Sequence, residues 1–355
     1  MLRYRMRWAS LWVCAVVAAG ASGQIVPERL YFGVDARIVV QVGVPEALAD
    51  AEAEIRLHDW ESGEVVASSA AVAGRADLAG LLPEIWEERS TRTRLAQLYA
   101  GGLAVGAPLV LQPLVTPNKA ALVDPSTMEP SMDPRAAVVF EDDRLPALAA
   151  RGLVETGERA VTYSGVRAYV DREVVVETTE GSMVFRLRPD AAPNTSFNFL
   201  HLVEGGFYTG VIVHRVVAAL TSGDPFVIQF GDLSGTGLGG PGYMVDLERG
   251  VLGHAFGVLS MARGTDPNSN GSQVFVCLSR AGTAFLDGRY TAFAEAVSGA
   301  DTIRAIAGAE VDADDRPVDP PVVVRAYTRD APAFPDRPEA LWRIEATIEA
   351  DAGGR

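Results

Sequence analysis

A glycine-rich run from Gly235 to Gly242 interrupts the second half of the chain and limits what that half can fold into. Its spacing, Gly235-x-Gly237-x-x-Gly240, has the letters of a dinucleotide-binding loop, which must follow a strand and open a helix. Pro241 comes directly after the last of these glycines, and no helical pattern of apolar residues begins there. The run therefore indicates a loop between β-strands and counts against a nucleotide-binding fold.

The length of the chain predicts two domains. It has 355 residues, and single hydrophobic cores usually stop growing before that size. In the first part, residues 24–115, Arg37 to Val44 is rich in Val and Ile, and Arg94 to Tyr99 and Leu103 to Leu111 flank Gly101-Gly102 and predict a hairpin. Several short strands with close turns predict a small β-sandwich-like domain. We find no catalytic constellation in it and interpret it as an interaction or spacer module, through which a protein partner could bind.

Residues 1–23 predict a signal peptide rather than a part of the fold. Three arginines between Arg3 and Arg7 precede an apolar stretch, Leu11 to Ala19, and Ala21-Ser22-Gly23 offers small residues for cleavage. A retained membrane anchor is the alternative, although the apolar stretch is shorter than the ~20 residues that a span needs. We therefore expect an exported protein of the periplasm or cell envelope.

The charge and the cysteine count exclude several classes of partner. The formal net charge is −15, and it becomes −18 when the three arginines of the signal peptide are removed. A surface this acidic repels phosphate backbones, which counts against nucleic acid as a partner. Cys14 and Cys277 are the two cysteines of the chain, so a disulfide framework is excluded. The four histidines lack the spacing of metal ligands, and we expect neither a metal nor a cofactor.

Two segments have no clear periodic pattern. In residues 116–165 five prolines, from Pro117 to Pro146, interrupt any regular element, and we interpret this segment as a connection between the domains. Residues 333–355 form a tail that we cannot assign.

The second domain, residues 166–332, opens with a predicted hairpin and a helix. Val174 to Thr178 and Ser182 to Leu187 are strand-like and are joined at Glu180-Gly181. Pro193-Asn194-Thr195 then starts a helix, which Gly205-Gly206 ends.

Six blocks follow this helix, and in their order they resemble the cyclophilin family. One is the glycine-rich run, and the others are His214-Arg215-Val216-Val217, Phe226-Val227-Ile228-Gln229, Leu259-Ser260-Met261-Ala262-Arg263, Asn270-Gly271-Ser272-Gln273-Val274-Phe275 and Phe285-Leu286-Asp287-Gly288-Arg289. The resemblance extends over about 160 residues, from Glu173 to Ala331. It implies a mainly β protein, in which a closed eight-stranded antiparallel cyclophilin-like β-barrel with two capping helices is preceded by the small β-sandwich-like domain.

The family catalyses cis-trans isomerisation of peptidyl-prolyl bonds, so proline-containing polypeptides are the implied partners. An X–Pro bond rotates across a barrier of roughly 20 kcal/mol, because twisting destroys the amide resonance. No covalent bond needs to break, so the site needs tighter binding of the twisted amide than of the planar one. An apolar pocket for the proline ring and a donor aimed at the prolyl nitrogen meet this need.

By resemblance, Arg215 is the donor and Gln229 assists it. Phe226, Phe275 and Leu286 resemble the wall of the proline pocket. The other residues that the resemblance brings to the substrate are His214, Ala262, Arg263, Gln273, Phe285 and Tyr290. Without the resemblance, a structural ion pair for Arg215 and core packing for the apolar residues would be the simpler interpretations.

Four departures from the family pattern affect activity. One is that Phe285 and Tyr290 replace the Trp and His found in many eukaryotic members. Ala218 to Asp224 looks like an inserted loop, which we expect to bulge outward and to leave the pocket wall in place. Phe230 stands where the family commonly has glycine, and Val274 replaces a usual aromatic residue. These departures keep a second function open, that of a cyclophilin-like peptide-binding or scaffold protein with weak catalysis.

Overall fold

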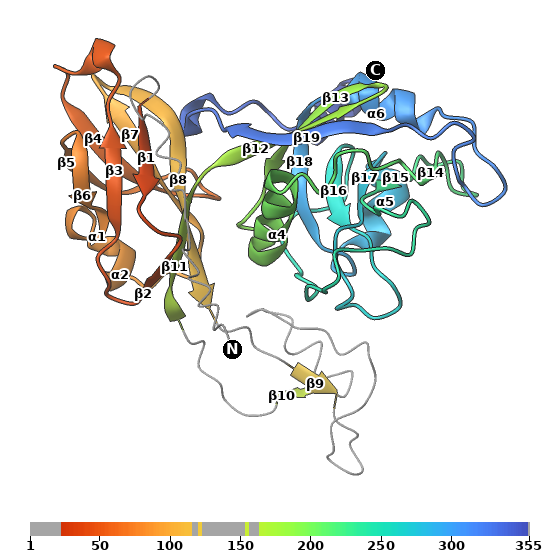
Figure 1. The fold of residues 1–355 in the computed structure, drawn as a ribbon, viewed down its shortest axis with the longest axis horizontal. Helices are drawn as coiled ribbons and strands as arrows, with labels where there is room; N and C mark the ends of the chain where they lie inside the picture. The colour runs from red at the N-terminus through yellow and green to blue at the C-terminus, as the bar shows by residue number, and fades with distance from the viewer. Residues whose placement is uncertain (1–22, 116–119, 123–152, 156–162, 354–355) are drawn as a thin grey trace, which may run out of the picture.

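The computed structural model of the chain describes residues 23–115, 120–122, 153–155 and 163–353. Figure 1 shows two β-rich parts next to each other, and the mainly β architecture expected from the sequence is confirmed. The expected signal peptide lies, except for Gly23, outside the described residues. Within those residues we find no helix with the length and apolar character needed to cross a membrane.

The first domain packs two antiparallel sheets around one core. The smaller sheet has the order β1 (Gln24–Pro27), β3 (Val39–Gly43), β6 (Gly74–Asp77), and the larger has the order β2 (Tyr31–Gly33), β11 (Tyr163–Val170), β8 (Leu103–Val115), β7 (Arg94–Ala100), β4 (Ala53–Asp59), β5 (Val65–Ala71). Val40 of the smaller sheet and Leu57 of the larger one are fully buried in the shared core. Three short helices, η1 (Glu46–Leu48), α1 (Leu78–Leu81) and α2 (Glu84–Glu87), complete this domain, and a separate two-stranded pair joins β9 (Ala120–Leu122) to β10 (Leu153–Glu155).

The predicted hairpin around Gly101-Gly102 is confirmed. Ala100, the last residue of β7, pairs with Leu103, the first of β8. Gly101 and Gly102 have φ angles of 58° and 79°, the left-handed conformation that both central residues of a two-residue hairpin turn need. Residues with a Cβ atom adopt this conformation at a cost, which explains the glycine pair.

Strand β11 changes where the first domain ends. It follows the proline-containing segment in the chain, yet it lies between β2 and β8 in the six-stranded sheet. The segment 116–165, predicted to connect the two domains, therefore starts after β8 and ends within β11 of the same sheet. Asp171 alone separates β11 from β12 (Arg172–Thr178), the first strand of the second domain.

The second domain contains one eight-stranded antiparallel sheet. Its order is β14 (Arg215–Val217), β15 (Val227–Phe230), β17 (Val274–Cys277), β16 (Val258–Met261), β18 (Ala292–Ser298), β13 (Gly181–Leu187), β12, β19 (Val323–Asp330). The predicted hairpin between β12 and β13 is confirmed, with Thr178 opposite Gly181. The helix predicted from Pro193 is also confirmed as α4 (Pro193–Glu204), and it ends at Gly205.

The expected closure of this sheet into a barrel is wrong, because the end strands β14 and β19 are not paired as strands. The chain ahead of them makes a single antiparallel bridge, Ile212 to Val322. In that register Val213 and His214 lie opposite Pro321 and Pro320, and the Val213 N–H donates to the Pro321 carbonyl at 2.8 Å. Prolines have no N–H to continue the ladder, so the sheet remains open between β14 and β19.

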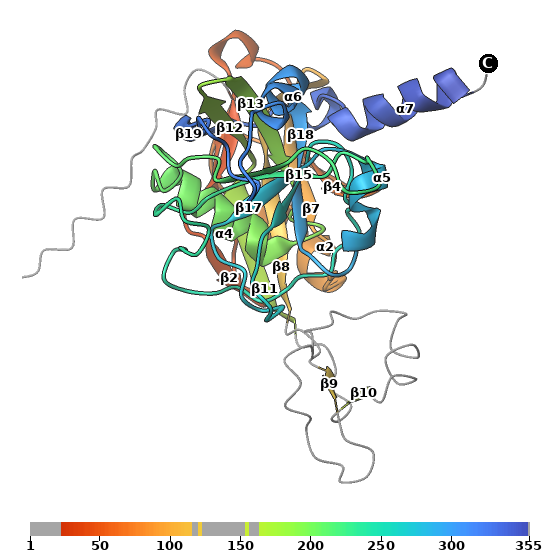
Figure 2. The ribbon, with the colours of Figure 1, turned by 90° about the vertical axis from the view of Figure 1, so that its right-hand side faces the viewer.

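Two helices contribute to the core of the second domain. Phe199 of α4 and Ile303 of α6 (Ala300–Ala307) are buried in the same apolar cluster. α6 lies above α4 in the views of Figures 1 and 2, so the two helices cover different ends of the sheet.

The tail beyond residue 332 crosses back to the first domain. Phe334, at the start of η3 (Phe334–Asp336), places its ring 4.9 Å from that of His58. Its backbone N–H donates to Oε1 of the fully buried Gln97 at 2.8 Å. The tail then continues into α7 (Leu341–Gly353), which extends away from both domains in Figure 2.

Asp171 and Arg337 hold the junction between the domains. The Asp171 N–H donates to the Pro108 carbonyl of β8 at 2.9 Å, and its own carbonyl accepts from the Ala331 N–H at 3.1 Å. The Asp171 carboxylate forms an ion pair with Arg337, and both side chains are more than nine-tenths buried. Arg337 also stacks over Trp60, 4.5 Å from the ring centroid. The first domain, the second domain and the tail therefore meet at one residue.

Candidate active site

Three adjacent strands place a row of side chains on one face of the eight-stranded sheet. Arg215 of β14 lies opposite Gln229 of β15, and Gln229 lies opposite Phe275 of β17. Residues directly opposite each other in antiparallel strands share a face. Beside this row is a pocket of about 500 Å³, lined by His214, Arg215, Phe226, Val227, Gln229, Thr236, Gly237, Ala262, Arg263, Phe275, Leu286, Tyr290, Asp314 and Arg316. All the predicted site residues except Gln273 and Phe285 line this pocket.

Arg215 reaches the pocket edge in an ion pair. Its Nη2 lies 3.3 Å from Oδ2 of Asp315, and the two side chains are 43% and 42% exposed. Asp315 is held by its backbone, because its carbonyl accepts from the Val216 N–H at 2.8 Å. A guanidinium has five N–H donors. Among the described residues Asp315 alone accepts from the Arg215 side chain, so other donors of Arg215 remain available to a ligand.

The apolar wall of the pocket belongs to a small buried cluster. Phe275 and Leu286 are 5% and 4% exposed, and Phe226 packs against the same cluster. Trp342 of α7 packs on this cluster as well. The tail therefore supports the back of the pocket wall.

His254 lies behind Phe275, with the two rings stacked at 6.0 Å. Its Nδ1 is 2.9 Å from Oδ1 of Asp287, and its Nε2 is 2.9 Å from Oγ of Ser260. Burial lowers the pKa of His254 despite the neighbouring Asp287 carboxylate, so the ring is neutral at pH 7. The contacts have the order of a hydrolytic triad, but Ser260 is fully buried and out of reach of a substrate.

Gln229 and Gln273 connect the pocket to the glycine-rich run. Gln229 Nε2 donates to Gln273 Oε1 at 2.9 Å, and Gln273 Nε2 donates to the carbonyls of Gly237 and Gly239 at 2.9 and 2.8 Å. Gln273 itself lines a second hollow of about 520 Å³, which shares Gln229, Ala262 and Arg263 with the first. The run lies between β15 and β16 without helix or strand, so the loop predicted there is confirmed.

The rim of the pocket carries aromatic rings. Arg263 stacks over Tyr290 at 4.5 Å and donates to the Arg289 carbonyl. Phe285, which is 51% exposed, lies outside the pocket lining and stacks on Phe226 with 5.8 Å between ring centroids. Phe285 therefore reaches the pocket only through Phe226.

His214 is buried beside Arg215 without a hydrogen bond to either ring nitrogen in the described part of the chain. Burial lowers the pKa of His214, so the ring is neutral and contributes apolar surface. In the same described ranges, no group of three or more His, Cys, Asp or Glu side chains is arranged to hold a metal ion.

Sequence reasoning missed the loop from Asp312 to Arg316, which brings Asp314 and Arg316 to the pocket lining and Asp315 to Arg215. Asp312 Oδ1 accepts from the N–H groups of Asp314 and Arg316 at 2.9 and 3.0 Å, which shapes the turn. Asp315 has a φ of 63°, and Arg316 donates to the Gly235 carbonyl at 2.6 Å. The run of acidic residues was a turn signal, but nothing local to it points to Arg215.

Comparison with known proteins places this site in a family. The model of the family described as cyclophilin type peptidyl-prolyl cis-trans isomerase matches residues 173–328. A Gibberella zeae protein named peptidyl-prolyl cis-trans isomerase-like 1 is 38% identical over 158 residues, which are 43% of this chain and 92% of that protein. The chain belongs to the cyclophilin-type peptidyl-prolyl isomerase family. It is thus an enzyme family member in which the isomerase domain is joined to a further β domain.

Other cyclophilin-type isomerases have similar sequence identity to this chain. The Schizosaccharomyces pombe isomerase ppi1 is 37% identical over 158 residues, covering 43% of this chain and 96% of that protein. A Staphylococcus epidermidis protein named as a putative isomerase is 34% identical over 176 residues, covering 41% of this chain and 86% of that protein. A crystal structure of a Cryptosporidium parvum cyclophilin-type isomerase, in the presence of the dipeptide Ala-Pro, is 30% identical, with a TM-score of 0.41, and the match covers 44% of this chain and 99% of that one.

The loop from Ala218 to Asp224, which the sequence predicts to be an insertion, turns on itself. The Leu220 N–H donates to the Asp224 carbonyl at 2.9 Å, and the Gly223 N–H donates to that of Leu220 at 2.8 Å. Its described residues, 218–225, are not among those that line the pocket. β15 begins at Val227, soon after the loop, and Phe226 and Gln229 both line the pocket.

The large side chain of Phe230 and the small side chain of Val274 are complementary in size. They are direct partners across β15 and β17, on the core face of the sheet. The resemblance implies a glycine at position 230 and an aromatic residue at 274, and here the aromatic ring is on β15 and the smaller side chain is on β17. Phe230 is 1% exposed and meets Tyr208 edge to face at 6.1 Å. The ring therefore fills the core face of the sheet, away from the pocket.

Proposed function

We propose that this cyclophilin isomerises X–Pro bonds in exported polypeptides, and that Arg215 stabilises the twisted amide in the apolar pocket. The observation that carries the proposal is the row of Arg215, Gln229 and Phe275 across three strands beside one pocket. It combines a charged donor with an apolar wall at one site.

The chemistry follows from what twisting does to the amide. As the bond rotates, the lone pair of the prolyl nitrogen localises and becomes a better acceptor, while the proline ring stays apolar. A ring held against Phe226, Phe275 and Leu286 would place that nitrogen near the Arg215 guanidinium. Because the guanidinium stays charged and its N–H fork is rigid, it interacts more strongly with the twisted amide than with the planar one.

Gln229 and Gln273 assist by fixing the walls. Gln273 uses both of its described donor contacts on the glycine-rich loop, and its oxygen accepts from Gln229. The Gln229 amide is therefore oriented, and since no described residue donates to its oxygen, that oxygen is available to accept a backbone N–H from the substrate.

The export of the substrates is supported by the basic and apolar pattern of residues 1–23. Fractionation of the source cells, with N-terminal sequencing of the purified protein, tests it. A first residue near Gln24 and recovery from the cell envelope are expected. Recovery of the intact N-terminus with the cytoplasmic fraction would contradict this part of the proposal.

A protease-coupled assay on a proline-containing anilide peptide tests the catalytic part. Arg215→Ala should lower kcat/KM about 100-fold or more, the usual effect of removing a donor to a transition state. Arg325→Ala is the matched control, since Arg325 is an exposed arginine on β19 that stacks on Tyr327. Equal rates for the three proteins would contradict the role of Arg215.

A second function, peptide binding with weak catalysis, is favoured by the ion pair between Arg215 and Asp315. A guanidinium neutralised by a carboxylate stabilises the twisted amide less. Titration with the same peptide and exchange spectroscopy separate the two functions, because saturable binding without accelerated exchange would indicate the second one.

A further inference from the structure

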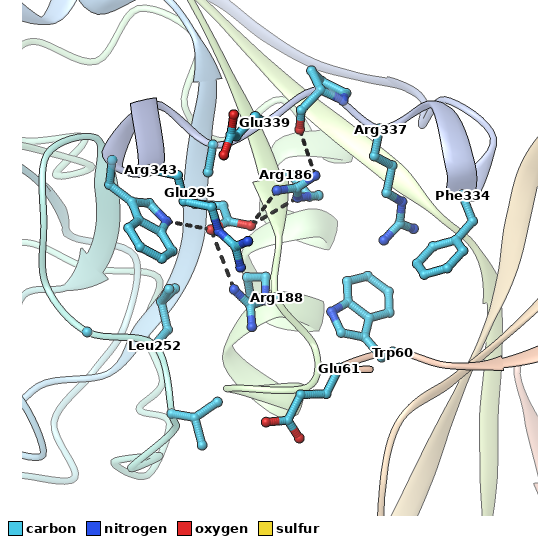
Figure 3. Close-up of a pocket in the computed structure, with 15 residues that line it drawn as sticks. Trp60, Glu61, Arg186, Arg188, Leu252, Glu295, Phe334, Arg337, Glu339 and Arg343 are labelled. Carbon is cyan, nitrogen blue, oxygen red and sulfur yellow. Dashed lines mark hydrogen bonds and ion pairs between the residues drawn. The ribbon is translucent and has the colours of Figure 1, made fainter. Parts of the chain in front are cut away.

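A separate pocket, distinct from the two hollows of the isomerase site, lies between the two domains (Figure 3). Its volume is about 560 Å³. Trp60 comes from the first domain, Arg188 and Leu252 come from the second, and Arg337 and Arg343 come from the tail. Trp60 and the two tail arginines lie outside residues 173–328, which match the isomerase family. The pocket therefore depends on what this chain adds to that family.

The interior of the pocket is lined by charged groups that are paired with one another. Glu295 is 2% exposed and accepts from Arg186 at 2.7 and 3.0 Å and from Arg188 at 3.4 Å. Arg188 also pairs with Asp190 at 2.6 Å, and Arg337 pairs with Asp171. Burial raises the pKa of Glu295, but Arg186 and Arg188 outweigh it and lower the pKa, so this carboxylate stays ionised.

One arginine of this pocket has no carboxylate partner among the residues that the structure describes. Four arginines line the pocket, namely Arg186, Arg188, Arg337 and Arg343, and three buried carboxylates pair with the first three of them. Arg343 stacks on Trp342 at 5.0 Å and makes no ion pair within the described chain. Glu61 and Glu339 also line the pocket, and like Arg343 they are exposed, so water screens the charges of all three side chains.

Three donors that line the pocket lack an acceptor among the residues that the structure describes. They are the Arg343 guanidinium, Nε1 of Trp60, and Nε of Arg337, which is buried. Figure 3 shows Arg186, Arg188 and Arg343 gathered around Glu295, with Trp60 and Phe334 on the side of the first domain. Of these three donors, Nε of Arg337 is the buried one, and a buried donor without an acceptor is costly, so a ligand that brings an acceptor would be favoured here.

We infer that this pocket binds a carboxylate carried on an apolar body. Arg343 offers its guanidinium N–H groups and Arg337 offers its buried Nε–H, and such groups pair with carboxylate oxygens. Trp60, Leu252 and Trp342 supply apolar walls for the rest of the ligand. The C-terminus of a polypeptide and a free small carboxylic acid share this chemistry. Either would contact the first domain, the second domain and the tail together.

The experiment titrates the purified full chain by calorimetry with N-acetyl-leucine, N-acetyl-leucinamide and inorganic phosphate. Tryptophan fluorescence reports where binding occurs, because Trp60 and Trp342 both line the pocket. Saturable binding of N-acetyl-leucine with a change in emission is expected, and binding of the amide should be at least ~10-fold weaker, since it lacks the charge-assisted hydrogen bonds. A pentapeptide ending in leucine, with a free or an amidated C-terminus, separates the two sources. Tighter binding of the free peptide than of N-acetyl-leucine indicates a polypeptide end.

Arg343→Gln should weaken binding of N-acetyl-leucine about 10- to 100-fold. Arg325→Gln is the matched control, because it removes another exposed arginine that stacks on an aromatic ring but lies outside the pocket. Trp60→Phe keeps an aromatic wall and removes the indole donor, so it should weaken binding by a smaller factor. Equal binding of the amide or of phosphate, no saturable binding, or equal effects of the two arginine substitutions would overturn the inference. Isomerase activity plays no part in these readouts.

Discussion

The Arg215 guanidinium lies 3.3 Å from the Asp315 carboxylate, and the two residues are 100 positions apart in the chain. Each side chain is about two-fifths exposed, so water screens the pair and its contribution to stability is at most ~1 kcal/mol. The pair keeps Arg215 at the edge of the pocket without burying it. This weak contact gives a direct way to separate a structural arginine from a catalytic one.

Asp315→Asn should change kcat/KM by no more than about fivefold, which corresponds to ~1 kcal/mol. Asparagine keeps the size of the side chain and tolerates the φ of 63° at this position. The protease-coupled assay compares this variant with Arg215→Ala. If Arg215 served only the ion pair, both substitutions would have the same small effect on activity.

Arg337→Met should lower the free energy of unfolding by about 3–5 kcal/mol, because it leaves the buried Asp171 carboxylate without its partner. Methionine keeps most of the apolar stem against Trp60 and Phe334. Urea denaturation followed by tryptophan fluorescence measures the change. Arg325→Met, on the exposed face of β19, should stay within ~0.5 kcal/mol of the wild type. A similar small loss for Arg337→Met would show that the junction contributes little to stability.

Stability should fall on acidification through the histidines. Burial lowers the pKa values of His254, His58 and His214, so the unfolded chain, with histidines near 6.5, takes up protons before the folded one does. The free energy of unfolding should therefore decrease as the pH falls through about 6.5 and stop decreasing, as far as these groups are concerned, below their folded pKa values. His254→Asn should reduce the slope between pH 7.5 and 5.5 in urea titrations. An unchanged slope would mean that His254 is not the buried neutral group described above.

Phe230 and Val274 should be energetically coupled. Phe230→Gly alone empties a core site and should cost at least ~3 kcal/mol, and Val274→Phe alone overpacks one and should cost about 1–3 kcal/mol. The double variant restores the glycine and aromatic arrangement usual in cyclophilins, so it should be more stable than the sum of the single changes by at least ~1 kcal/mol. Urea denaturation of the four proteins gives the coupling energy, and additive losses would contradict the compensation.

Local patterns predicted much of the fold and most of the pocket. The two hairpins with glycine turns and the helix between Pro193 and Gly205 depend on neighbouring residues, so the sequence carries their signal. Arg215, Gln229 and Phe275 each lie in a short block, and the resemblance of these blocks to the family indicated that the three residues belong to one site.

Contacts between distant residues escaped the same reasoning. The sheet is open because Pro320 and Pro321 lie opposite the residues that precede β14. The register between two distant strands cannot be predicted from the sequence of either strand alone. Asp315 and Arg337 bind partners 100 and 166 positions away. The tail has no periodic pattern, because Phe334 and Arg337 are held by contacts with distant residues of the first domain, such as His58 and Trp60.

The position of β11 between β2 and β8 affects how the protein forms on the ribosome. Most strands of the first domain emerge early, but among the described strands β2 pairs only with β11, whose last residue is Val170. The six-stranded sheet therefore stays incomplete, with one edge of β8 unpaired, until the segment from residue 116 to β11 has been synthesised. The second domain begins one residue later, so the nascent chain completes its first core only as the isomerase domain starts to leave the exit tunnel.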